Sequence, residues 1–420
     1  MKTGFFSFLF VAAMLLFSSL HAQDLIRQTV PETLVREGIM SVSRGVGFLL
    51  KKQNSDGSFC DDPAITALCM MAINRAGEAV PAEKRDAAVN KARAYILKFV
   101  QKDGSIQIPG RRRAYPTYST AIALTALATL RREEDKEVML RARKFLLSLQ
   151  LDEDNADRPT QKDDPKYGGF GYGPGKRGAG HVDLSNTQWV AEALHASEYL
   201  LREPEKADAA SIRESELAWD KLEQFVTKMQ HLPQTNKSAW VVSSPDDENY
   251  GGFVYQTEMN VPGGRGGRGG RGGRGGGEET AVNIKTGRAQ TLRSYGSMTY
   301  AGLKSMIYAK VKKDDPRVKA AIGWAHKHYT LDENPGLGSA GHYYYLQTFA
   351  KAHSALGMDE ITTAKGEKRN WRADVIGKLL SLQRENGEWY NENNRYMERL
   401  SELVTAYCLI TMEFALAGEL

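Results

Sequence analysis

The sequence has few groups that could hold a fold together covalently or bind a highly charged partner. Only three of its 420 residues are cysteines, Cys60, Cys69 and Cys408, and three cysteines cannot form a framework of disulfide bridges. Its net charge of +5 is matched by Lys2 and four arginines of one glycine tract, so the remainder is close to neutral. This balance predicts neither a basic surface suited to nucleic acid nor an acidic one, and stability must come from packing.

Long apolar runs are confined to the first residues. Residues 1–22 contain Lys2, an apolar run from Phe5 to Phe17, and small or polar residues up to Ala22. This layout is typical of a secretory signal peptide cleaved near Ala22. The alternative is an uncleaved N-terminal anchor, although the run is shorter than a spanning helix. We therefore predict a secreted or periplasmic protein with one domain at 23–420 and no stable membrane span after signal removal.

The sequence does contain a repeat of two helical segments. Six segments combine a short polar start with an apolar run that lacks Pro and is too long for a strand, which predicts six buried inner helices. They are centred on Thr66, Thr120, Thr187, Thr299, Tyr345 and Thr405. An amphipathic outer segment precedes each one, and five of these end at a glutamine, namely Gln53, Gln101, Gln150, Gln230 and Gln383. A glycine-containing turn joins the two segments, because glycine tolerates the positive φ of a tight turn.

Six such hairpins predict an all-α fold, as either an open superhelix or a closed α6/α6 toroid. We predict the toroid, because six hairpins are the number that closes a ring. The longest connections, Gln150 to Thr187 and Gln230 to Thr299, lie on one face, and insertions confined to one face usually mark the functional rim.

The second long connection contains a Gly/Arg-rich tract, which we predict to be a disordered loop at residues 261–280. Such tracts in intracellular proteins often bind RNA. Behind a signal peptide, a flexible loop is the better interpretation, so no nucleic-acid partner is predicted.

With the repeat laid out, the chain resembles the superfamily of squalene–hopene cyclases and protein prenyltransferases from Leu34 to its C-terminus. The resemblance rests on the turns QNSDGSF from Gln53 and QRENGEW from Gln383, which look like the QW repeats of that family. In these repeats the Gln and the aromatic residue tie neighbouring outer helices together. The resemblance implies a terpenoid cyclase/protein prenyltransferase-like toroid, with a ligand cavity near the N-termini of the inner helices. It also implies a secreted bacterial prenyltransferase and squalene oxidase repeat protein.

The chain departs from the cyclase pattern at Asp183-Leu184-Ser185-Asn186-Thr187. Triterpene cyclases carry Asp-x-Asp-Asp-Thr here, and the third-position acid protonates an alkene or epoxide. Ser185 and Asn186 stand in place of the two later carboxylates, and neither side chain can deliver a proton to an alkene. The resemblance therefore does not extend to the usual proton-initiated cyclisation.

The chain also departs from the prenyltransferase pattern Asp-x-Cys-x-Ser-x-Trp, whose Asp and Cys bind zinc with a His from a later inner helix. Ser185 replaces the Cys, and Met298 or Tyr344 stands where the His is expected. A serine hydroxyl is a poor zinc ligand compared with a thiolate. We predict no metal site of this kind and no cofactor.

The remaining candidates lie on the rim, where helix N-termini converge and favour anions. Candidate catalytic residues are Asp183, His181, Asp62, Tyr118 and His342. Candidate ligand-binding residues are Tyr115, Trp189, Tyr295, Tyr343, Arg399 and Glu402. Each has an ordinary alternative: Asp62 and Asp183 can simply cap helices, tyrosines can line a cavity without reacting, and Arg111–Arg113 can be a solvated run instead of an anion clamp.

Three functions remain open. The first is an exported repeat protein that binds or acts on an apolar, isoprenoid-like ligand in the ring, terpenoid cyclase- or transferase-like if it is an enzyme. The second is a secreted carbohydrate-active toroid, a lyase or hydrolase, acting on a glycan. The third is a non-catalytic module that presents its rim to another protein. An aromatic, uncharged cavity favours the first, a shallow Arg-rich cleft the second, and a filled ring the third.

Overall fold

A computed structural model describes residues 30–111, 115–202, 209–257 and 292–416. The predicted signal peptide at 1–22 and the predicted loop at 261–280 lie outside the described residues. Within the described part, no helix is long and apolar enough to span a membrane.

Two concentric layers of helices make up the described part of the chain. The inner helices are α3 (Pro63–Arg75), α5 (Pro116–Leu130), α8 (Leu184–Ala196), α10 (Gly296–Tyr308), α12 (His342–Leu356) and α14 (Ser401–Leu416). The outer helices are α2 (Glu32–Lys52), α4 (Ala82–Leu97), α6 (Lys136–Ser148), α9 (Ala209–Lys228), α11 (Pro316–Lys327) and α13 (Trp371–Leu382). A short helix, α7 (Gly175–Gly180), and an antiparallel hairpin of β1 (Glu360–Thr362) and β2 (Lys368–Asn370) lie in the connections.

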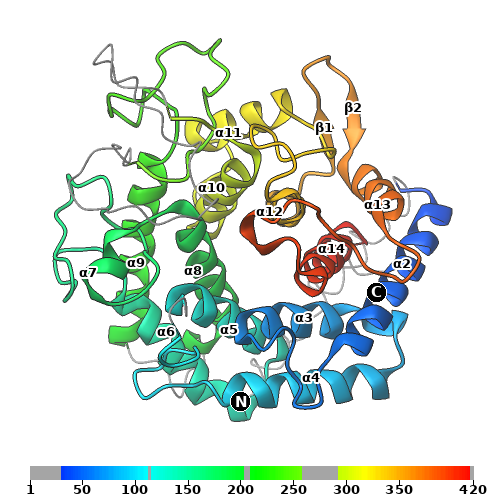
Figure 1. The fold of residues 1–420 in the computed structure, drawn as a ribbon. Helices are drawn as coiled ribbons and strands as arrows, with labels where there is room; N and C mark the ends of the chain where they lie inside the picture. Colours follow the sequence, from blue (N-terminus) through cyan, green and yellow to red (C-terminus); the bar gives the residue numbers. More distant parts are fainter. Residues whose placement is uncertain (1–29, 112–114, 203–208, 258–291, 417–420) are drawn as a thin grey trace, which may run out of the picture.

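The ring is closed. Each inner helix contacts the next along the chain, and α14 packs back against α3, while α13 contacts α2 in the outer layer. Figure 1 looks down this ring, with α3 and α14 side by side although they stand at opposite ends of the repeat array. The prediction of an all-α toroid is confirmed, and an open superhelix is excluded.

The repeat glutamines join each turn to the next outer helix. The Gln383 amide nitrogen donates to Gly387 O in its own turn (3.0 Å) and to Ser41 O on α2 (2.9 Å), which links the last repeat to the first. Gln53, Gln150 and Gln230 make the same pair of bonds, with next-helix partners Ala88, Ala218 and Arg317. Gln101 differs, since its amide binds carbonyls on either side of its own turn and Arg141 of α6 donates to its backbone oxygen. The tie implied by the QW resemblance therefore holds in four of the five glutamine turns.

The repeat threonine has a structural role in the same joint. Its hydroxyl accepts the backbone N–H of the residue after the turn, as in Phe59 N to Thr66 Oγ1 (2.9 Å) and Trp389 N to Thr405 Oγ1 (3.2 Å). The fifth repeat lacks both the Gln and the Thr, and there the Tyr345 hydroxyl donates to Thr330 O (2.7 Å). The two departures in the sequence thus compensate for each other.

The turn glycines permit the close approach that the joint requires. Gly387 has a φ of +92°, and a Cβ there would lie 2.4 Å from Arg44 O of α2, whereas a Cβ at Gly323 on α11 would meet nothing within 4 Å. Gly387→Ala should lower the unfolding free energy by about 1–3 kcal/mol through backbone strain. Gly323→Ala should leave it unchanged or raise it by up to about 1 kcal/mol, because alanine favours helix. Urea denaturation of both variants tests this, and equal behaviour would contradict it.

Candidate functional site

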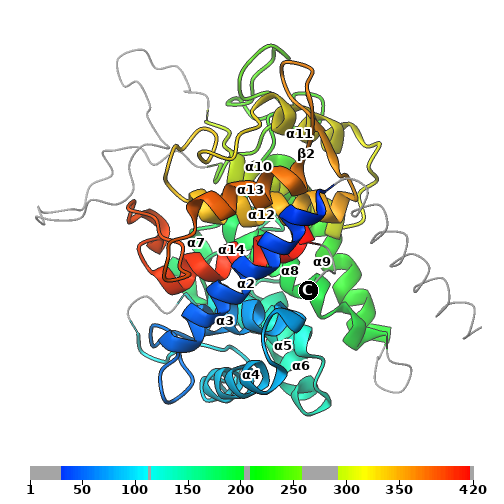
Figure 2. The same ribbon diagram turned by 90° about the vertical axis from the view of Figure 1, so that its right-hand side faces the viewer.

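A cavity of about 310 Å³ lies inside the ring at the N-terminal ends of the inner helices. The residues that begin or precede these helices contribute to its wall, including Asp62, Tyr115, Ser185, Tyr295 and Gly341. The loop before α14 also reaches the cavity through Tyr396 and Met397. Figure 2, a view turned by 90°, shows this loop in orange-red on the same side of the ring as the blue connection between α2 and α3.

The cavity wall is mostly aromatic and aliphatic. Its aromatic members are Tyr115, Tyr118, Tyr172, Trp189, Tyr255, Tyr295, Tyr344, Tyr396 and Tyr407. Its aliphatic and thioether members are Ala64, Ile65, Leu68, Ile122, Met298, Met397 and Leu403. Among the described residues that line it, Asp62 alone is charged, and its carboxylate pairs with Arg111 at 3.0 Å. Arg112 and Arg113, the rest of the proposed anion clamp, lie outside the described residues.

Backbone strain gathers at the mouth of this cavity. Cys60, Asp61, Tyr115, Tyr396 and Met397 all have φ between +45° and +65°, in the left-handed region that disfavours side chains. Cys60 and Asp61 directly precede the cavity residue Asp62, and the other three line the cavity themselves. Strained residues of this kind cluster at functional sites, where the surrounding structure holds them in place.

Asp183 is the buried carboxyl behind the cavity wall. It caps α8, accepting the Asn186 backbone N–H (2.7 Å) and side-chain amide (2.8 Å), and it also accepts the Tyr255 hydroxyl (3.0 Å). Burial raises its pKa to about 6, against the lowering effect of these hydrogen bonds. The Tyr255 hydroxyl also bonds to the Tyr172 hydroxyl (2.6 Å), so a chain of two tyrosines connects Asp183 to the cavity.

A second set of hydroxyls crosses the ring, and we call Tyr118, Ser185 and Tyr344 the hydroxyl triad. The Tyr118 hydroxyl donates to Ser185 Oγ (2.6 Å), and Ser185 Oγ lies 3.2 Å from the Tyr344 hydroxyl. The Gln188 amide nitrogen also donates to Tyr344 (3.0 Å). Because α8 and α12 are separated by α10 in the ring, Tyr344 spans the interior to reach Ser185.

A buried ionic cluster lies against Trp189, one of the cavity aromatics. Glu192 of α8 pairs with Lys304 of α10 (2.5 Å) and with Lys351 of α12. The two ammonium groups lie 5.8 and 5.4 Å from the centroid of the Trp189 ring. Burial alone would raise the pKa of Glu192, but the two lysines outweigh it and hold the pKa at about 2. The cluster joins three inner helices close to the cavity.

The structure brings about half of the predicted site residues together. Asp62, Tyr115, Tyr118, Trp189 and Tyr295 line the cavity. Asp183 does not line the cavity, but it accepts a hydrogen bond from the cavity residue Tyr255. Asp62 and Asp183 also cap α3 and α8, so the structural alternative holds for both of them.

The other five candidates lie outside the cavity lining. His181 is exposed at the end of α7. His342 is buried, with its ring nitrogen bonded to Leu331 O at 2.9 Å, and the Tyr343 hydroxyl donates to Tyr390 O. Arg399 is exposed and donates to Glu392 O, and the Glu402 side chain bonds to Cys60. Local loop and helix-end contacts hold these side chains, which a sequence pattern alone does not reveal.

Several cavity residues were missed. Tyr172 and Tyr255 each lie two positions beyond the aromatic residue of a turn, after Phe170 and Phe253, and this shared spacing was the available signal. Tyr407 lies two positions beyond a repeat threonine, and Tyr344 one position before the repeat tyrosine. Tyr396 and Met397 carry no such signal.

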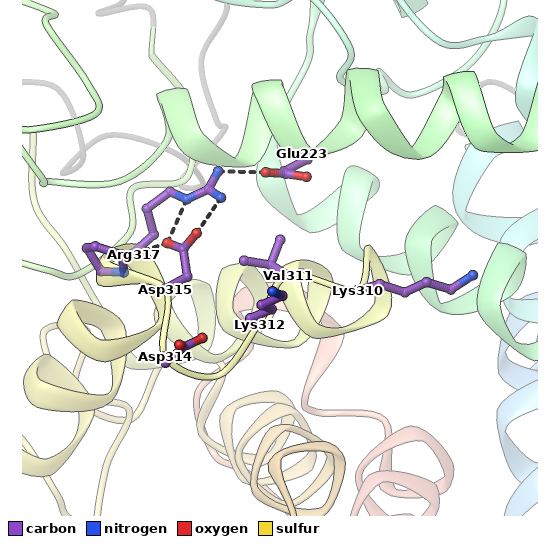
Figure 3. Close-up of a pocket in the computed structure, with 8 residues that line it drawn as sticks. Glu223, Lys310, Val311, Lys312, Asp314, Asp315 and Arg317 are labelled. Carbon is purple, nitrogen blue, oxygen red and sulfur yellow. Dashed lines mark hydrogen bonds and ion pairs between the residues drawn. The ribbon is translucent and has the colours of Figure 1, made fainter.

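A second, open pocket lies on the outer surface between α9, α11 and the end of α10. Figure 3 shows that its central charge, Arg317, points to Asp315 and Glu223, which it pairs with at 2.8 Å each. Lys310 on its edge pairs with Glu198. Because these charges already neutralise one another, the ring cavity is the stronger candidate site.

No protein-family model matches the sequence, and no curated protein matches it. Solved structures match its fold. The type II terpene cyclase MstE from Scytonema, in its apo form, has 13% sequence identity over 91% of this chain and 98% of its own, with a TM-score of 0.50. A variant of MstE in complex with geranylgeranyl dihydroxybenzoate, its substrate, has the same identity and TM-score over 91% of this chain and 99% of its own. The fold is thus an all-α, terpenoid cyclase-like toroid.

Proposed function

We propose that this chain is an exported member of the squalene–hopene cyclase and prenyltransferase superfamily that binds an apolar, isoprenoid-like ligand in its ring cavity. The observation that supports this most is the wall of the cavity, which is aromatic and aliphatic with one charged residue at the mouth. Concave, mostly apolar pockets with a few placed polar groups are the usual form of small-molecule sites. The MstE variant of the same fold holds a substrate with a geranylgeranyl chain, which accords with the proposal.

The two alternatives fit the cavity less well. A glycan presents many hydroxyls or charges, and a site for it needs matching polar groups, whereas this wall is dominated by carbon. A module that only presents its rim to a partner would not need an open space of about 310 Å³ in the ring. The apolar cavity therefore supports the first function over both.

The proposal does not include proton-initiated cyclisation or zinc-dependent transfer. Ser185 takes part in the hydroxyl triad, and Asn186 donates to Asp183. Neither side chain is an acid. Asp183 itself caps a helix and is separated from the cavity by Tyr255. The site supports binding of the ligand and placement of a polar group on it.

Ligand classes can be compared directly on the purified protein. We expect the hydrocarbon farnesene to displace an apolar fluorescent probe, N-phenyl-1-naphthylamine, at micromolar concentration, and a glycan array to give no signal. Incubation with squalene should yield no polycyclic triterpene by mass spectrometry. Glycan binding without probe binding would contradict the proposed function, and a polycyclic product would contradict the exclusion of cyclisation.

Export is tested separately from ligand binding. The mature protein isolated from its host should begin near Gln23, as read by N-terminal sequencing. A mature chain that keeps residues 1–22 and stays in the cytosol would contradict export while leaving the ligand proposal standing.

A further inference from the structure

The polar groups of the cavity are gathered beside α5 and α8. The hydroxyl triad is centred there, since Tyr118 comes from α5 and Ser185 from α8. The Tyr118 and Tyr172 rings lie 5.9 Å apart, so the tyrosine chain from Asp183 ends next to the triad. Ser119, the neighbour of Tyr118, also lines the cavity, and its buried hydroxyl oxygen has no hydrogen-bond partner among the described residues. By contrast, α3 contributes only carbon through Ala64, Ile65 and Leu68.

The hydroxyl triad contains more hydrogens than it uses internally. Three hydroxyls supply three hydrogens, yet the triad has two hydrogen bonds, Tyr118 to Ser185 and Ser185 to Tyr344. Gln188 brings its own hydrogen to Tyr344, so it consumes none of these. In whichever direction the Ser185–Tyr344 bond runs, one O–H within the triad has no acceptor there.

Turning the Gln188 amide over does not remove the surplus. Tyr344 could then donate to the amide oxygen, but the amide nitrogen would take the buried position that has no hydrogen-bond partner among the described residues. A buried donor without an acceptor is costly, so a partner is expected at this patch. The triad and Ser119 together therefore offer donors to a ligand.

The tyrosine chain offers an acceptor at the same place. With a pKa of about 6, Asp183 is mostly ionised at neutral pH and accepts the hydrogen of Tyr255. Tyr255 has no second hydrogen, so the hydrogen of Tyr172 is directed to Tyr255 or to Asp183, with which it also makes a hydrogen bond. The oxygen of Tyr172 keeps a free lone pair at the cavity wall, which can accept a ligand hydroxyl.

A charged head group fits this cavity poorly. The buried cluster against Trp189 has two ammonium groups and one carboxylate, and its net positive charge disfavours a cation. An anion would find several inner-helix N-termini already occupied by carboxylates, since Asp62 caps α3, Asp183 caps α8, and Glu398 accepts the N–H groups of Tyr343 and Tyr344 at the start of α12. At these three helices the positive end that would attract an anion is thus already occupied.

From this geometry we infer that the ligand is an apolar molecule with one neutral hydroxyl or carbonyl group, bound with that group at Ser119, Ser185, Tyr344 and Tyr172. This inference rests on the proposed function and specifies its ligand class. The apolar body of the ligand extends along α3, past Ile65 and Leu68. A hydroxyl is the best match, because it can accept from the triad and donate to Tyr172.

A matched ligand series tests the inference on the purified protein. Farnesol should bind at least about tenfold more tightly than farnesene, an amount that one buried hydrogen bond can supply. Farnesylamine and farnesoate should both bind more weakly than farnesol. Equal affinity of farnesol and farnesene, or tighter binding of either charged ligand, would overturn the inference while leaving the proposed function intact. Failure of all four ligands to bind would overturn both.

Two variants and one control variant test where the polar group of the ligand binds. Tyr172→Phe removes the acceptor and Ser119→Ala removes a donor, so each should reduce the preference for farnesol over farnesene to about threefold or less, with farnesene affinity unchanged. Tyr95→Phe removes the hydroxyl of a buried tyrosine on the outer helix α4, outside the cavity lining, and should leave the preference unchanged. Loss of the preference in Tyr95→Phe, or an unchanged preference in both of the other variants, would contradict the assignment.

Discussion

Replacing Glu192 by Gln is expected to lower the unfolding free energy by about 3–5 kcal/mol, because it removes the carboxylate that pairs with two buried ammonium groups. Glu192 holds Lys304, whose side chain is fully buried, and Lys351, which is 4% exposed. The three residues come from α8, α10 and α12, so the loss would loosen one side of the inner ring. Urea denaturation followed by circular dichroism measures the effect.

The matched control is Glu198, six residues further along the chain, which pairs with two exposed cations instead of two buried ones. Glu198 pairs with Arg202 and Lys310, whose side chains are 69% and 71% exposed, so Glu198→Gln should cost less than about 1 kcal/mol. The triple change of Glu192→Leu with Lys304→Met and Lys351→Met should regain most of the lost stability, since an apolar replacement removes the buried charges together. A cost below about 1 kcal/mol for Glu192→Gln would show that the lysines reach water or another anion.

The low pKa of Glu192 also predicts that the stability of the fold depends on pH. The folded pKa of Glu192, about 2, lies below its ordinary value of 4.5. Its ionised form therefore stabilises the fold fully above about pH 4.5, and this contribution is lost as the pH falls towards 2. The stability difference between the wild type and Glu192→Gln should shrink over that interval.

Filling the cavity with Leu68→Trp is expected to weaken binding of an apolar ligand by at least about 100-fold, since the indole would occupy the space in which the ligand body lies. Leu68 lies on α3 and lines the cavity with 2% of its surface exposed. Overpacking costs about 1–3 kcal/mol, so thermal unfolding must be measured beside binding.

Leu140→Trp provides the control for that substitution. Leu140 lies on the outer helix α6 and is 37% exposed, so the same chemical change there should leave ligand affinity unchanged. Retained affinity in a folded Leu68→Trp variant would show that the ligand binds elsewhere.

The ring itself could be predicted from the sequence because its determinants are local and repeated. Four of the six turns reuse the same parts: a glutamine that reaches the next helix, a glycine at positive φ, and a threonine that accepts one backbone N–H. Five glutamines and five threonines in register leave few alternatives to hairpins of constant geometry. Closure followed from the number of hairpins, and the bond from Gln383 to Ser41 provides it.

Many cavity residues also occur at fixed positions relative to the repeat threonine, although the sequence prediction did not use this spacing. The residues two positions before and two positions after the repeat threonine face the ring, as Tyr118 and Ile122 do around Thr120 and as Ser185 and Trp189 do around Thr187. Positions four apart share one face of a helix, so both line the same space. The prediction instead favoured loop residues such as His181 and Arg399, which local contacts keep out of the cavity.

The long connections could not be placed from the sequence. Tyr172 and Tyr255 reach the cavity from two different insertions and meet only through their hydroxyls, 83 residues apart in the chain. Tyr396 and Met397 depend on two successive left-handed residues, which no glycine marks. Contacts of this kind depend on tertiary structure and leave no period in the sequence.

A crystal structure of the purified protein with farnesol tests the central claim most directly. We expect electron density for the ligand inside the ring, with its chain against Leu68 and its hydroxyl within hydrogen-bond distance of Ser119, Ser185, Tyr344 or Tyr172. An empty cavity at a saturating farnesol concentration, or density only on the outer surface, would contradict the claim that the closed ring binds an apolar ligand.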